Sequence, residues 1–140
     1  MRVVVFSPAD SFTENSLPEL TSDDDIVVVC WRAGSHEGSR RIGLPPHRFA
    51  DRVARAADVH VTLRTLVRVS PFDRGAVFWR AARRSADVAK AAMAADLLVA
   101  PERDGAFAAW NALARARRHG RRPLAVSGYP AARAAIERLR

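Results

Sequence analysis

The sequence predicts one α/β domain over residues 1–140, a Rossmann-like three-layer sandwich with about five mostly parallel strands flanked by helices. Short runs rich in β-branched residues alternate with longer, alanine-rich segments of helical spacing. The runs are apolar throughout rather than alternating, which is typical of strands buried on both faces of a parallel sheet. A chain of 140 residues also has the usual length of a single domain.

The first half of the chain begins with two such runs. Residues 2–7 and 26–31 are predicted strands, joined by a polar, proline-containing segment with at most one helical turn. Residues 33–46 are predicted to form a loop, because three glycines and two prolines interrupt them. We expect a helix from about Pro46, and a further strand over residues 59–63.

In the second half of the chain, predicted helices and strands alternate more regularly. The predicted elements are a helix over 73–96 interrupted near Ser85, a strand over 97–101, a helix over 105–120, a strand over 123–128 and a helix over 130–140. In the helix that ends at Gly120, the spacing of Phe107, Trp110 and Leu113 predicts a face that packs on the core.

The charge of the chain is +8, and Lys90 is its single lysine, so 22 of its 23 basic residues are arginines. An arginine and alanine bias of this kind is typical of GC-rich coding. The alternative is an acidic or phosphorylated partner, because guanidinium groups bind phosphates and carboxylates in bidentate fashion.

Several classes of protein are excluded or disfavoured. Cys30 is the only cysteine, so no internal disulfide can form. The apolar run at the N-terminus is too short for a signal peptide, and no stretch approaches the roughly 20 residues of a membrane span, so we expect a cytoplasmic protein. The glycine motifs of dinucleotide and phosphate loops, the serine-hydrolase elbow and the zinc-protease motif are absent. We therefore expect no cofactor and no metal.

Polar residues follow the predicted strands, and in an open parallel sheet ligands bind beyond the carboxyl ends of the strands. The loop over residues 31–41 offers two kinds of chemistry: an acid–base pair at His36 and Glu37, and an anion clamp at Arg40 or Arg41. The candidate ligand-binding residues are Ser7, Asp10, Arg32, His36, Glu37, Arg40, Arg41, Glu102, Arg103 and Asp104.

A structural explanation stands beside each of these candidates. Ser7 and Asp10 also fit an ordinary turn, and residues 31–41 also fit a surface loop. The sequence PERDG at 101–105 equally fits a connector in which the Asp104 side chain caps the following helix. The sequence identifies no catalytic residue.

The sequence VVVCWRAGSHEGSRR, followed by PHRFADRVARAADVHV, resembles the opening of GT-B glycosyltransferases of actinobacterial type. Residues 74–118 resemble a later part of their acceptor-side domain, in which a helix leads to a strand and an aromatic helix. Those enzymes also need a second Rossmann domain for the nucleotide-sugar donor, which 140 residues cannot hold. The resemblance therefore implies a domain that binds a sugar, a sugar phosphate or a partner domain, and that does not catalyse transfer alone.

Two alternatives remain open. Residues 38–49 followed by 95–128, with GRRP at 120–123, also resemble nucleotide-binding domains of the lysine-decarboxylase-like and DprA-like type, although the paired glycines of their phosphate loop are missing. The basic run at 115–122 suggests a protein that interacts with nucleic acid.

Overall fold

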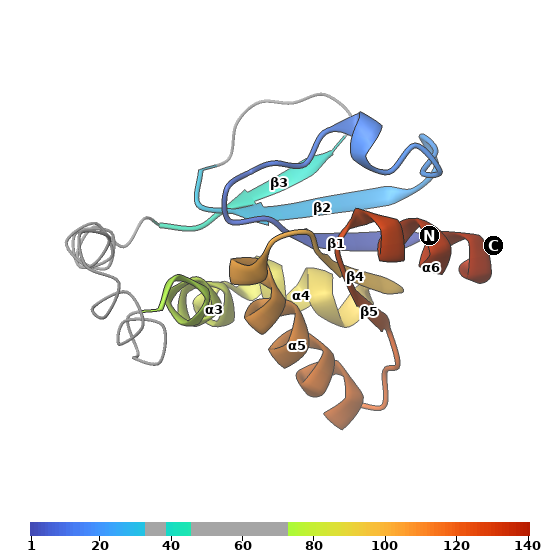
Figure 1. The fold of residues 1–140 in the computed structure, drawn as a ribbon. Coiled ribbons are helices and arrows are strands. Elements are labelled where there is room, and N and C mark those ends of the chain that lie inside the picture. Colours follow the sequence, from blue (N-terminus) through green and yellow to red (C-terminus); the bar gives the residue numbers. More distant parts are fainter. Residues whose placement is uncertain (33–38, 46–72) are drawn as a thin grey trace.

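The computed structural model describes residues 1–32, 39–45 and 73–140, which form a five-stranded parallel sheet with helices on both faces (Figure 1). The strand order is β3-β2-β1-β4-β5, and every neighbouring pair is parallel. The strands are β1 (Arg2–Phe6), β2 (Asp25–Cys30), β3 (Arg40–Gly43), β4 (Leu97–Ala100) and β5 (Leu124–Ser127). The predicted Rossmann-like α/β class is confirmed.

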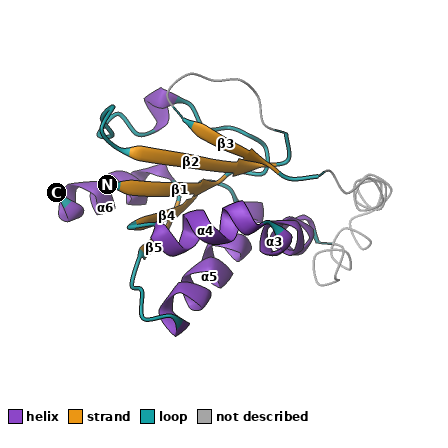
Figure 2. Cartoon of the chain, turned by 180° about the vertical axis from the view of Figure 1, so that it is seen from behind, coloured by secondary structure: helices purple, strands orange, loops and turns teal. Residues whose placement is uncertain are grey.

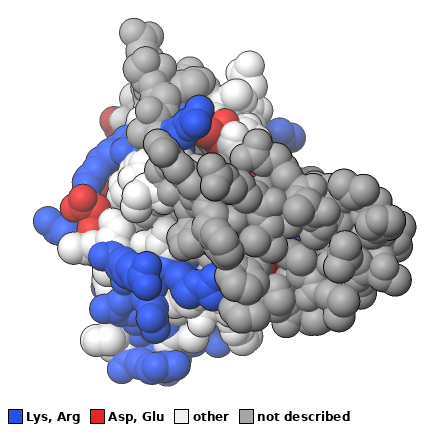
Figure 3. All heavy atoms as spheres, turned by 90° about the vertical axis from the view of Figure 1, so that its left-hand side faces the viewer, with Lys and Arg blue, Asp and Glu red and all other residues white. Residues whose placement is uncertain are grey.

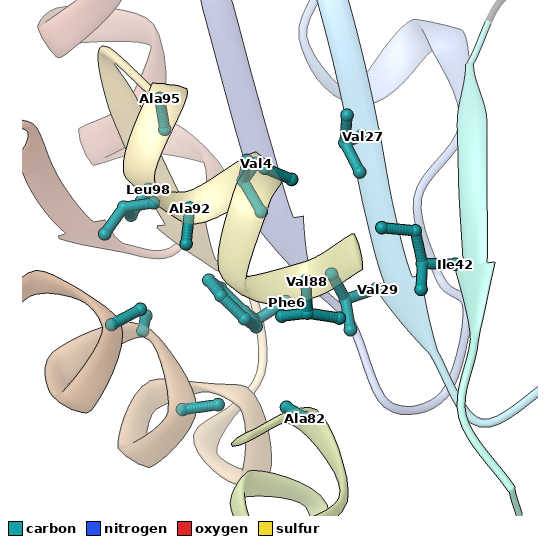
Figure 4. Packing of buried hydrophobic residues seen from close by; sticks show 14 of the residues in the cluster. Val4, Phe6, Val27, Val29, Ile42, Ala82, Val88, Ala92, Ala95 and Leu98 are labelled. Carbon is teal, nitrogen blue, oxygen red and sulfur yellow. The ribbon is translucent and has the colours of Figure 1, made fainter. Parts of the chain in front are cut away.

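The helices form the two outer layers (Figure 2). They are the short 3₁₀ helix η1 (Glu14–Ser16), α3 (Arg74–Arg84), α4 (Ala86–Ala94), α5 (Arg103–Arg118) and α6 (Tyr129–Leu139). One core cluster joins the sheet to α3, α4 and α5, and Figure 4 shows Phe6, Val29 and Leu98 among its side chains. A second cluster joins the opposite face to α6 and to Phe12 and Leu17, which flank η1.

The predicted interruption at Ser85 is confirmed. Ser85 has extended backbone angles, ends α3 and begins α4, and its hydroxyl accepts a hydrogen bond from Val88 N–H at 3.3 Å. Serine is favoured at such a position because its side chain satisfies an amide of the first helical turn.

The loop predicted over residues 33–46 is wrong at Arg40–Gly43, which form β3. This strand has one buried residue, Ile42, so its sequence lacks the apolar run that marks the other strands. Pairing with β2 decides its conformation, since strand formation depends on neighbours more than on local propensity. The predicted helix from Pro46 and the predicted strand over 59–63 lie outside the described residues.

Two predictions for α5 are also wrong. Phe107 and Trp110 are 48% and 64% exposed instead of facing the core, because the buried face of α5 consists mainly of alanines. The helix begins at Arg103 with Glu102 at its N-cap, so Asp104 lies inside the first turn and is not the capping residue. Leu113 is buried, as predicted.

A glycine brings α5 onto the end of β1. A Cβ atom added at Gly105 would lie 2.0 Å from the carbonyl oxygen of Phe6, so no larger residue fits without a shift of the backbone. Gly75 has less space than usual but more than Gly105, since its Cβ would lie 3.1 Å from Asp73 Oδ2 and 3.2 Å from the carbonyl oxygen of Asp104. The first turns of α3 and α5 therefore meet beside the carboxyl end of β1.

Arginines dominate one part of the surface. On the face shown in Figure 3, blue side chains gather in the lower part with no acidic side chain visible among them. Within the described residues, no helix is long and apolar enough to span a membrane.

Candidate functional site at the carboxyl edge of the sheet

A cleft of about 220 Å³ opens at the carboxyl edge of the sheet. It lies where the loop after β1, the end of β2 and the first turns of α3 and α5 come together. The strand order reverses between β1 and β4, and ligands of open α/β sheets bind at such a point. The lining residues are Pro8, Ala9, Trp31, Arg74, Val77, Glu102 and Asp104.

Glu102 is held in place by the loop after β1. Its Oε1 atom accepts hydrogen bonds from the hydroxyls of Ser7 at 2.7 Å and Ser11 at 2.6 Å, and its Oε2 atom accepts from Ala9 N–H at 3.2 Å. The side chain makes no capping bond to α5, because its carboxylate is directed to these three donors. A carboxylate has about four acceptor positions, so Oε2 retains capacity for one further donor.

Ser7 and its turn form the base of this arrangement. Ser7 is fully buried, and its hydroxyl also accepts a hydrogen bond from Ser11 N–H at 3.0 Å. Asp10 N–H donates to the Ser7 carbonyl at 3.0 Å, and Asp10 has a φ of 57°, a left-handed conformation that aspartate tolerates better than most residues. The turn predicted from the sequence is therefore present, and it is also what holds Glu102.

Trp31 and α3 form the opposite side of the cleft. The Trp31 ring packs edge-on against Phe78 with ring centroids 5.2 Å apart, and Trp31 is itself partly exposed. Asp73 caps α3 by accepting hydrogen bonds from Gly75 N–H at 3.0 Å and Ala76 N–H at 3.3 Å. Since Arg74 and Val77 follow directly on this helix, the cap positions them at the cleft.

Asp104 lies among like charges in a partly buried position. Burial raises its pKa above the ordinary value of 3.8, and the nearby carboxylate of Asp73 raises it further. Arg103 and Arg74 oppose this shift. Asp104 therefore holds a proton more readily than an exposed aspartate, and its carboxyl group can donate as well as accept a hydrogen bond near acidic pH.

The structure brings one predicted group together and separates the others. Glu102 and Asp104 line the cleft, and the buried Ser7 donates a hydrogen bond to Glu102. Arg103 lies beside the cleft, with its Nη2 atom 3.7 Å from Asp73 Oδ1. Arg32 is exposed just after β2. His36 and Glu37 lie outside the described residues.

Arg40 and Arg41 belong to β3 and not to the cleft. Arg40 is exposed at the start of the strand. The Arg41 side chain is 4% exposed and forms an ion pair with Asp10, and its Nη2 atom donates to the Phe12 carbonyl at 3.2 Å. Phe12 belongs to the core cluster beneath α6, so Arg41 and Asp10 pair on the opposite face of the sheet from α3.

The sequence reasoning missed Trp31, Ser11 and the α3 residues Arg74 and Val77. Trp31 had a usable signal, since it directly follows the apolar run of β2. Asp73 had one as well, because an aspartate before a helical segment is a typical N-cap. No local signal could place α3 beside α5, because that contact depends on packing at Gly75 and Gly105.

Among the described residues, no group of three or more His, Cys, Asp or Glu side chains is arranged to hold a metal ion. Comparison with known proteins found no family, no curated protein and no solved structure that matches this chain.

Proposed function

We propose that the cleft binds a sugar, and that the domain acts as the acceptor-side half of a glycosyltransferase-like protein without catalysing transfer alone. The observation that carries this proposal is the presence of Trp31, Glu102 and Asp104 in one cleft. An indole ring offers a flat apolar surface to the C–H face of a sugar ring, and carboxylates accept hydrogen bonds from its hydroxyls.

The electrostatics favour a neutral, hydroxyl-rich group over a phosphate. The amide and hydroxyl donors of the loop after β1, which could hold an anion, already donate to Glu102. A phosphate in the cleft would also lie near the carboxylates of Glu102 and Asp104, and like charges repel. Arg74 lines the same cleft and can interact with a ligand oxygen, so a sugar that carries a phosphate remains the second choice.

The size of the cleft supports a small ligand. A volume of 220 Å³ is below the roughly 300–1,000 Å³ of sites for drug-sized molecules, which suits one sugar ring better than a dinucleotide. Ser7 and Glu102 resemble a nucleophile with its base, but Ser7 is fully buried, so its role is to hold Glu102. This supports binding without catalysis by the domain itself.

Thermal-shift measurements with neutral monosaccharides, sugar phosphates and nucleotides test the proposal. A ligand at 100 times its Kd adds about 2.7 kcal/mol to the free energy of unfolding, so a specific ligand is readily detected. We expect stabilisation by at least one sugar, a weaker effect of its phosphate, and loss of the effect in Glu102→Gln. The exposed Glu137→Gln on α6 is the matched control and should respond like the wild type.

Two results would contradict the proposal. Stabilisation by nucleotides or inorganic phosphate, with none by any sugar, would favour a nucleotide-binding module. Efficient transfer from a nucleotide sugar to an acceptor by the purified 140-residue chain would show that the domain catalyses alone.

A further inference from the structure

The β5 edge of the sheet, away from the cleft, has the properties of a binding surface. In the described sheet β5 pairs with β4 only. Leu124 N–H donates to the Asp96 carbonyl and Gly128 N–H donates to the Ala100 carbonyl, each at 2.9 Å. Alternate residues of a strand direct their backbone groups to opposite sides, so those of Ala125 and Ser127 face the open edge.

β5 is short, with four residues, and it lacks the charges, prolines and bulges that prevent pairing at many natural edge strands. Natural edge strands carry charged residues, prolines or bulges, which prevent pairing with another chain. β5 has the sequence LAVS, with no charge and no proline. The other edge differs, because β3 carries the charged residues Arg40 and Arg41.

Two exposed hydrophobic residues, Leu124 and Leu139, lie at the start of this edge strand. Within the described residues, the exposed large hydrophobic side chains are Phe107 and Trp110 on α5, Leu124 on β5 and Leu139 on α6. Figure 1 shows β5 at one end of the sheet with α5 and α6 beside it. Leu124 and Leu139 line one hollow of about 250 Å³ at the start of β5.

Trp110 lies away from the packed side of α5. Ala112 and Arg115 of this helix line a hollow together with residues of α3 and α4. Trp110 precedes Arg115 by five positions, which places it about 140° around the helix from that side. The indole ring is therefore not directed towards α3 and α4, and it is 64% exposed.

The charge around the edge favours an acidic partner. Arg121 and Arg122 line the hollow beside Leu124, directly before β5, together with one acidic residue, Asp96, whose carboxylate accepts a hydrogen bond from Arg2 N–H at 2.8 Å. Residues 105–136 contain six arginines and no aspartate or glutamate. A second copy of this chain would bring the same arginines together, whereas an acidic segment would have complementary charge.

We propose that the β5 edge binds an extended, acidic segment of a partner protein, which joins the sheet as a sixth strand. The backbone groups of Ala125 and Ser127 would supply the hydrogen bonds of the new pair. Its apolar side chains would cover Leu124 and Leu139, and its carboxylates would lie near Arg121 and Arg122.

A dye-labelled peptide, Glu-Val-Glu-Val-Glu-Val, is the probe, and fluorescence anisotropy measures its binding to the full chain. We expect saturable binding that weakens as salt is added, and slower hydrogen exchange at the amides of Ala125 and Ser127. Ala125→Pro should weaken binding about tenfold, because it removes one edge donor and the close approach of the new strand. The substitution leaves the amides that face β4 intact, so the thermal midpoint should remain close to that of the wild type.

Charge reversal gives an independent readout that does not depend on a proline. Arg121→Glu with Arg122→Glu should also weaken peptide binding about tenfold, whereas Arg83→Glu with Arg84→Glu, at the exposed end of α3, should not. Absence of binding to folded protein, or equal loss in both charge variants, would overturn the proposal. A dimer in sedimentation equilibrium that Ala125→Pro dissociates would also overturn it, since the edge would then bind a second copy.

Discussion

Removal of the Glu102 side chain should destabilise the fold, because this carboxylate joins the loop after β1 to the start of α5. Glu102→Ala deletes the acceptor of three hydrogen bonds, of which those from Ser11 and Ala9 are exposed and that from Ser7 is partly buried. Water replaces the two exposed bonds at little cost, whereas a buried donor that loses a charged acceptor costs about 1.5–3 kcal/mol. We expect a total loss of about 2–4 kcal/mol.

Urea denaturation measures this loss directly, and the exposed Glu137→Ala is the control, with an expected change within about 0.5 kcal/mol. Glu102→Gln keeps one acceptor oxygen and should lose less than Glu102→Ala. If Glu102→Ala unfolds at the same urea concentration as the wild type, the carboxylate does not hold the loop, and our account of how the cleft is built is wrong.

Three further substitutions test the packing and the charges. Gly105→Ala should lower the free energy of unfolding by about 1–3 kcal/mol in urea denaturation, because the new Cβ would meet the Phe6 carbonyl. This loss is expected even though alanine has a helix propensity roughly 1 kcal/mol better than that of glycine. A variant as stable as the wild type would refute the close approach. Asp104→Asn should flatten the pH dependence of stability above pH 3.8: a raised pKa means that the folded state binds more protons than the unfolded state, so Asp104 lowers stability as the pH rises. Hydrogen bonds from Thr21 and the N-terminal ammonium lower the pKa of Asp24 below 3.8, so the stability it contributes is present above that pH and lost in acid. Asp24→Asn should therefore destabilise the protein more in thermal melts at pH 7 than at pH 2, and equal losses at both would contradict the assignment.

Strands with a continuous apolar run could be predicted from the sequence, whereas a strand whose conformation depends on pairing with its neighbour could not. The apolar runs of β1, β2 and β4 are buried except at Ile26, which is partly buried, and their composition alone marks them as strands of a parallel sheet. β3 lacks such a run, because it is an edge strand with one buried residue. The helical spacing of the aromatic residues in α5 led to a wrong prediction, because alanines fill the buried face and Phe107 and Trp110 are exposed.

The position of the site at the edge of the sheet could be predicted from the sequence, but the contacts between its residues could not. Ser7 and Glu102 follow the ends of different strands, so parallel topology alone predicts that they share an edge of the sheet. Their hydrogen bond depends on how closely α5 approaches β1 at Gly105, which no local pattern specifies. The same limit applies to Arg41, whose pairing with Asp10 on the other face depends on the position of β3.

The most direct test of the proposed sugar site is a titration of the isotope-labelled chain with the sugar that stabilises it most, followed by amide and indole resonances. We predict saturable shifts at Ala9, Glu102, Asp104 and the Trp31 indole, and their loss in Asp104→Asn with Glu102→Gln, while resonances of α6 remain unchanged. Shifts confined to other parts of the chain, or none with any sugar, would contradict the assignment of this cleft as a sugar site.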